Sequence, residues 1–186
     1  YSVERTVKSA VTECELTPLG LIEIGSGTIN YNVRLKLRLL QGTLDQLPLL
    51  LPPGVIVREL SADAVAIPFA LSESEAGTLL TCTPAEPLRD QAEWRLKFQL
   101  DRINSAKTNL LPPLRWASEK SPIALRIPLQ EFALRTQPDQ FLTLPPDPGE
   151  AVSVIPIELF LESWGMESPA PQAAFRLNAP TPIEFK

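Results

Sequence analysis

Apolar and polar residues alternate one by one between residues 29 and 39. The apolar positions are Ile29, Tyr31, Val33, Leu35, Leu37 and Leu39, and the polar positions are Asn30, Asn32, Arg34, Lys36 and Arg38. Successive side chains of an extended backbone point to opposite faces, so the apolar groups of this run share one face. No helical period fits the pattern. It predicts a strand with one buried and one wet face, in a register that keeps the cations out of the core.

A second alternating run covers residues 94–101, where Trp94, Leu96, Phe98 and Leu100 occupy every other position. Shorter apolar runs follow one another between prolines and glycines, and we expect strands at residues 21–24, 44–51, 55–60, 64–71, 78–83, 123–128, 132–135, 141–144, 152–161 and 174–177. Residues 18–20, Pro-Leu-Gly, predict a turn. Many short strands at turn-marked spacing favour an all-β fold, with one or more antiparallel β-sandwiches and little helix.

The domain organisation is predicted from length and from one proline-rich corner. A chain of 186 residues can bury a core without a metal. Its 20 prolines are scattered between apolar runs. Their share of the residues is roughly twice the usual value of about 5%, and we interpret them as breaks between strands. Residues 110–114, Leu-Leu-Pro-Pro-Leu, form a corner between two β regions. We expect regions 1–113 and 114–186, with one continuous domain as the alternative.

Net charge and hydropathy bear on the partners of the chain. The 22 acidic and 17 basic residues give a formal charge of −5 at pH 7. This balance gives no electrostatic reason to bind nucleic acid or anionic lipid. No apolar run reaches the length of about 18 residues that a spanning helix needs, so we expect no direct membrane insertion of these residues.

Histidine is absent from the sequence. Its absence removes the commonest general base near neutral pH and the commonest metal ligand. A nucleophile–histidine arrangement, a histidine-bearing zinc site and a facial-triad iron site are therefore excluded within this chain. A calcium loop needs closely spaced oxygen ligands, and the sequence has no such spacing. We expect no metal and no cofactor here.

The two cysteines, Cys14 and Cys82, are too far apart in sequence for a CxxC redox motif or a zinc ribbon. A disulfide between them would close a long loop, suit an oxidising compartment and stabilise the fold by roughly 2–4 kcal/mol. Two buried free thiols are the alternative. Both interpretations stay open from the sequence.

Three tryptophans raise the question of sugar binding, because sugar rings stack on exposed indole faces. Trp94 lies on the apolar face of its run and is expected in the core, whereas Trp116 and Trp164 flank polar segments. These two are the candidate sugar platform. The favoured interpretation is that both are half-buried at best and bind no sugar.

The cation row of Arg34, Lys36 and Arg38 is a candidate interaction face for an acidic partner. The favoured interpretation is a solvated strand face that discourages unwanted edge pairing. Paired carboxylates form a third kind of candidate site, because two acids can act as general acid and base. Asp139, Asp147 and Glu150 lie in proline- and glycine-rich loops and are expected to be solvated turn residues.

Several segments resemble β-sandwich segments of large, mostly uncharacterised bacterial extracytoplasmic proteins. They are the amphipathic RLKLRL run, the LPLLLPPGVIV run, the later WRLKFQLDRI strand, the LPPL corner and the late AAFRLNAPTPIEF segment. The resemblance implies an exported, scaffold-like chain, located in the periplasm or at the cell surface, with no catalytic residue to carry over.

Together these observations predict a non-enzymatic structural or protein-interaction module of an exported or surface-associated bacterial protein. Its expected partners are other protein chains or a second copy of itself. A carbohydrate-binding module is the alternative, and a hydrolase that uses carboxylates alone is the third hypothesis.

Overall fold

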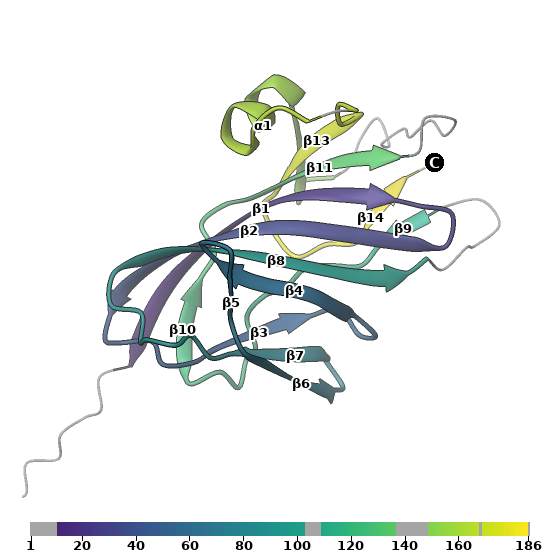
Figure 1. Cartoon of the computed structure of the whole chain (residues 1–186). Coiled ribbons are helices and arrows are strands. Elements are labelled where there is room, and N and C mark those ends of the chain that lie inside the picture. The colour runs from purple at the N-terminus through teal and green to yellow at the C-terminus, as the bar shows by residue number, and fades with distance from the viewer. Residues whose placement is uncertain (1–10, 103–108, 137–148, 168, 186) are drawn as a thin grey trace, which may run out of the picture.

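The computed structural model describes residues 11–102, 109–136, 149–167 and 169–185 (Figure 1). Strands dominate, and the all-β prediction is confirmed. The strands are β1 (Thr12–Ile24), β2 (Thr28–Gln41), β3 (Leu47–Leu51), β4 (Ile56–Ala62), β5 (Val65–Ala66), β6 (Phe69–Ser74), β7 (Gly77–Cys82), β8 (Gln91–Asp101), β9 (Asn109–Leu111), β10 (Ile123–Arg126), β11 (Gln130–Thr136), β12 (Val152–Ile155), β13 (Ala173–Leu177) and β14 (Ile183–Phe185). One helix, α1, covers Ile157–Trp164. The strand expected at 141–144 lies outside the described residues.

The two alternating runs of the sequence form neighbouring strands at the centre of a nine-stranded sheet. Its order is β12-β13-β11-β1-β2-β8-β4-β5, and β10 also pairs with β1. β2 and β8 are antiparallel, with Tyr31 opposite Phe98. The two rings stack with centroids 4.4 Å apart. The predicted faces are confirmed, because Tyr31, Val33, Leu35 and Leu37 are buried while Lys36 and Arg38 are exposed.

The large sheet is mixed, which corrects the expectation of purely antiparallel pairing. β1 pairs in parallel with β10 and with β11, and antiparallel with β2. Strands from both sides of residue 113 therefore share one sheet. The main core likewise contains Val33 and Leu96 together with Phe132 and Phe175.

Two smaller sheets complete the fold. β3, β7 and β6 form a three-stranded antiparallel sheet, and β9 pairs with β14. Leu49 of β3 and Leu80 of β7 are fully buried in the same core as the inner residues of β2 and β8. The main core therefore lies between the large sheet and the three-stranded sheet, with α1 on the far side of the large sheet (Figure 1).

Helix α1 corrects the strand expected over residues 152–161, of which only 152–155 are extended. Phe160 and Trp164 are buried one turn apart and stack on each other. With Ile157 and Leu161 they follow the helical i, i+3, i+4, i+7 spacing, a signal present in the sequence. These side chains pack on Leu19 and on other residues of the outer sheet face to form a second, small core.

The turn expected at residues 18–20 is also wrong, because β1 continues through it. Gly20 pairs with Val33 of β2 and with Phe132 of β11. A methyl group at Gly20 would lie 2.7 Å from Cε1 of Phe132. Gly20 therefore leaves room for the Phe132 ring to pack against the backbone of β1, and it does not mark a reversal of the chain.

In the described part of the chain, no helix is both long enough and apolar enough to span a membrane.

Candidate functional site

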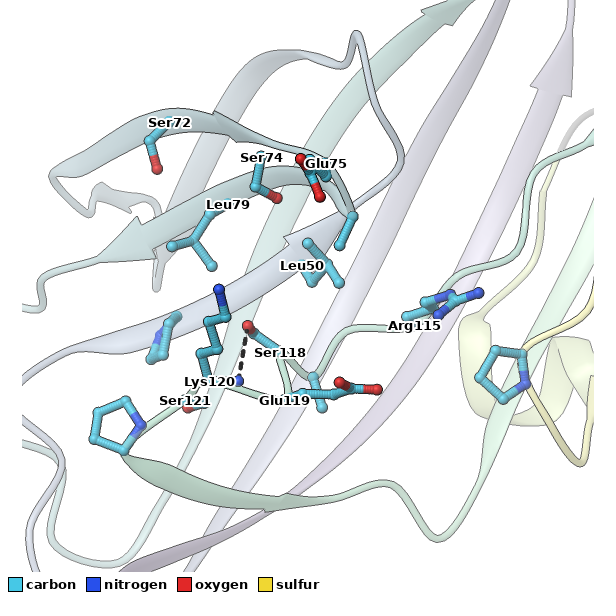
Figure 2. A pocket seen from close by; sticks show the side chains of 15 residues that line it. Leu50, Ser72, Ser74, Glu75, Leu79, Arg115, Ser118, Glu119, Lys120 and Ser121 are labelled. Atoms are coloured by element: carbon cyan, nitrogen blue, oxygen red, sulfur yellow. Dashed lines mark hydrogen bonds between the residues drawn. The ribbon is translucent and has the colours of Figure 1, made fainter.

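A groove separates the three-stranded sheet from the segment 115–122 (Figure 2). Its volume is about 840 Å³, and pockets that hold small ligands measure about 300–1,000 Å³. The strands β3, β6 and β7 form one wall, the segment 115–122 forms the other, and Pro180 also lines the groove.

The sheet side of the groove follows from strand register. Leu79 of β7 pairs with Leu50 of β3 on one side and with Ser72 of β6 on the other, so the three side chains form one row on one face. This row faces the groove, whereas Leu49 and Leu80, at alternate positions, face the core. The wall is therefore apolar at its centre and carries a serine hydroxyl at its edge.

The opposite wall reverses direction at Trp116. This residue has a φ of 60°, in the left-handed region. The N–H of Ala117 donates to the carbonyl oxygen of Arg115 at 2.7 Å. A hydrogen bond that closes three residues around a positive φ belongs to the strained form of the γ-turn. Strained backbone of this kind persists where surrounding contacts over-determine it, and it clusters at ligand sites.

Three hydrogen bonds hold Trp116 in this conformation. Its N–H donates to the carbonyl oxygen of Leu50 at 3.1 Å, and its own carbonyl oxygen accepts from the N–H of Leu50 at 2.7 Å. The indole Nε1 donates to Oε1 of Gln130 at 3.0 Å. Trp116 is fully buried and Gln130 is nearly so. The second wall is thereby tied to the first, and the groove is preformed.

Charges of both signs surround the groove. Arg115 and Lys120 are basic, Glu75 and Glu119 are acidic, and all four are exposed. Figure 2 shows the Lys120 side chain extending from its segment toward the three-stranded sheet. Over the residues that the structure describes, its ammonium group is in no ion pair.

The two tryptophans proposed as a sugar platform are both in the interior. Trp116 is 0% exposed and Trp164 is 3% exposed. Trp116 supports the groove from behind, and Trp164, the last residue of α1, packs on the outer face of the large sheet. Both indoles are buried more deeply than the sequence predicted, and neither presents an open face on which a sugar ring could stack.

The cation row of β2 is divided among different contacts. Arg38 forms an ion pair with Glu15 at 3.1 Å, and Lys36 is exposed. The guanidinium of Arg34 lies over the ring of Trp164, 4.4 Å from its centroid. The Nε of Arg34 is buried and, within the described residues, has no hydrogen-bond acceptor. The three cations therefore do not act as one uniform face.

Cys14 and Cys82 are both buried and free. Of the two alternatives from the sequence, the structure has the free thiols. Burial raises the pKa of Cys14 to about 11 and that of Cys82 to about 12, because a thiolate loses its hydration in an apolar core. Neither side chain is a reactive thiol at neutral pH.

Of the three carboxylates singled out from the sequence, one lies in the described part of the chain. Asp139 and Asp147 lie outside the described residues, and Glu150 is exposed. No group of three or more Cys, Asp or Glu side chains among the described residues is placed to hold a metal ion.

Comparisons with known proteins find the fold in hydrolases. The sequence matches no protein-family model and no curated protein. In structure the chain is similar to native yeast LTA4 hydrolase, with a TM-score of 0.51 and 13% identity, over 95% of this chain and 28% of the other. It is also similar to a mutant two-domain M1 zinc metallopeptidase bound to L-arginine, with a TM-score of 0.51 and 11% identity, over 94% of this chain and 41% of the other. The likeness is one of fold.

These neighbours contradict the prediction of a non-enzymatic structural or interaction module, and with it the carbohydrate-binding alternative. The fold occurs within a hydrolase and a metallopeptidase, of which this chain spans 28% and 41%. The prediction rested on the absence of histidine, which does not exclude a fold that occurs in such enzymes. An enzyme built from several domains can hold its histidines in one domain and none in another.

The zinc of such enzymes does not fit the residues of this chain. Catalytic zinc sites are typically built with at least one histidine, with carboxylates or thiolates as companions. The 186 residues contain no histidine, and both thiols are buried in the core.

Proposed function

We propose that residues 1–186 form one domain of a larger protein of the metallopeptidase type. The observation that carries the proposal is the fold similarity to yeast LTA4 hydrolase and to the two-domain M1 zinc metallopeptidase, which extends over nearly the whole chain. The metal-binding residues then belong to a part of the protein outside residues 1–186, because no histidine is present here.

The groove gives this domain a part in substrate binding. An extended peptide presents apolar side chains, backbone hydrogen-bonding groups and a terminal carboxylate. Leu50 and Leu79 offer an apolar surface, the hydroxyl of Ser72 lies at its edge, and Lys120 reaches in from the other wall. The hydrogen bonds between Trp116 and Leu50 tie the two walls of the groove together, which lowers the ordering cost of binding.

The first experiment tests the metallopeptidase assignment on the intact protein. Elemental analysis should find bound zinc, and short peptides should be cleaved at a rate that a metal chelator abolishes and added zinc restores. A protein without zinc and without chelator-sensitive peptide cleavage would overturn the assignment.

The second experiment tests the groove through Lys120→Ala. For a peptide with a free C-terminal carboxylate, KM should rise by about two- to fivefold, the range expected for one solvated ion pair. The same peptide with an amidated C-terminus should show no change. Lys36→Ala, on the outer face of β2, is the matched control and should leave both KM values unchanged. Equal effects of Lys120→Ala on the two peptides would contradict a carboxylate contact.

A further inference from the structure

Cations and acids face each other in rows across the outer face of the large sheet. Arg38 of β2 lies opposite Glu15 of β1. Lys36 lies opposite Glu93 of β8. Directly opposite residues on one face have Cβ atoms about 4.5–5.5 Å apart, so each acid offsets the charge of its neighbour.

The same balance holds for Lys97 of β8. It lies opposite Glu59 of β4, and its Nζ donates to Oε2 of Glu59 at 2.7 Å. This contact, above all the hydrogen bond, lowers the pKa of Glu59. Oε1 of Glu59 accepts from Ser61 at 3.0 Å.

One row breaks this pattern. Arg34 of β2 lies opposite Arg95 of β8. The outer neighbours in the row are Leu19 of β1 and Ser61 of β4, and neither carries charge. The acid that Arg95 acts on is Glu59, two positions from Ser61 in the neighbouring row, where it is already bound to Lys97. Like charges directly opposite each other destabilise a sheet. Within the described ranges, neither arginine forms an ion pair.

The guanidinium of Arg34 is held in place from one side. It lies 4.4 Å from the ring centroid of Trp164, and Nε1 of Trp164 donates to Glu167 at 2.9 Å. Stacking on an indole fixes the plane of a guanidinium while leaving its N–H groups available in that plane. The buried Nε of Arg34 makes no hydrogen bond within the described residues, so this donor lacks the acceptor that buried polar groups normally have.

We infer that Arg34 and Arg95 form a binding site for an oxyanion, a phosphate or carboxylate group that offers two or more oxygens. Such a group accepts in-plane hydrogen bonds from the fork of each guanidinium. It replaces the repulsion between the two cations with attraction to both. The site lies on the outer face of the large sheet, whereas the groove lies along the three-stranded sheet, so it does not depend on the proposed function.

Isothermal titration of the intact protein with inorganic phosphate, at constant ionic strength, tests the site. The wild type should bind phosphate saturably, and Arg95→Gln should weaken binding by about tenfold or more, since charge-assisted bonds to a guanidinium are strong. Lys36→Gln removes a neighbouring cation from a balanced row and should leave binding within about twofold. Equal losses in the two variants, no loss in Arg95→Gln, or no saturable binding would overturn the inference. A parallel titration with acetate distinguishes a site that also binds carboxylates from one that requires a phosphate. Binding of either anion supports the proposed site if the binding depends on Arg95.

Thermal unfolding supplies a readout that a purely structural role of Arg95 would not give. Without anions that bind, Arg95→Gln should unfold at the same temperature as the wild type or higher, because the substitution removes repulsion. Phosphate should raise the unfolding temperature of the wild type more than sodium chloride of equal ionic strength does, and this excess should vanish in Arg95→Gln. A lower unfolding temperature of Arg95→Gln in anion-free buffer, or an excess that persists in it, would overturn the site.

Discussion

The indole Nε1 of Trp116 donates to Oε1 of Gln130 at 3.0 Å, and both residues are buried. This bond joins the strained turn behind the groove to the first residue of β11. An indole N–H in a core needs such a partner, because an unpaired buried donor forfeits its hydration without compensation.

Gln130→Leu should therefore destabilise the protein by about 1–3 kcal/mol, the usual cost of one unsatisfied buried group. Chemical denaturation measures the change in the free energy of unfolding. Gln91→Leu at the exposed start of β8 is the control, expected within about 0.5 kcal/mol of the wild type. Similar losses of unfolding free energy in both variants would show that the hydrogen bond to Trp116 does not stabilise the protein.

Gly20→Ala should destabilise by about 1–3 kcal/mol, the range for overpacking a filled core. The added methyl group would lie 2.7 Å from Cε1 of Phe132 and 2.8 Å from its Cδ1. Gly27→Ala is the matched control, because no atom lies within 4 Å of its added methyl group. The double variant Gly20→Ala with Phe132→Leu should lose less than the sum of the two single changes. Strict additivity would contradict a direct clash.

Ala64→Gly should stabilise the protein by about 0.5–1 kcal/mol. Asp63 and Ala64 form the two-residue loop between β4 and β5, with φ values of 47° and 63°. Positive φ at both central residues is the type I′ arrangement, in which glycine avoids the strain of a Cβ atom. Ala76→Gly, in the loop between β6 and β7, provides the comparison, since Ala76 has no positive φ. Ala76→Gly should not raise the midpoint of chemical unfolding. If both variants raise it, relief of backbone strain at Ala64 is not the cause.

Cys14 and Cys82 should resist alkylation in the folded protein. Burial raises the pKa of these thiols to about 11 and about 12, so at pH 8 almost no thiolate is present to react. Mass spectrometry after iodoacetamide treatment without reductant should find both thiols unmodified in native protein and alkylated after denaturation. Rapid labelling of native protein would contradict their burial, and no labelling after denaturation would indicate a disulfide.

The sequence by itself determined the strands that carry a period of two. In residues 29–39 and 94–101 each side chain is assigned to a face by its neighbours along the chain, and burial of Tyr31 and Phe98 follows the predicted faces. The spacing of Phe160 and Trp164 is likewise a local signal, and it indicates the helix α1. The apolar run that precedes it led to the prediction of a strand instead. The predicted location outside the cytoplasm stays a prediction.

Only the tertiary structure decided what lies opposite each residue. The alternation placed Arg34 on the wet face, yet its position beside Arg95 and over Trp164 depends on strand register and on a helix far along the chain. The groove joins residues 48–79 to the segment 115–122, and Gly20 is explained by Phe132. Local pattern fixes the face on which a side chain points, because backbone geometry repeats along the strand. Partners are fixed by packing between distant segments, which a local pattern does not record.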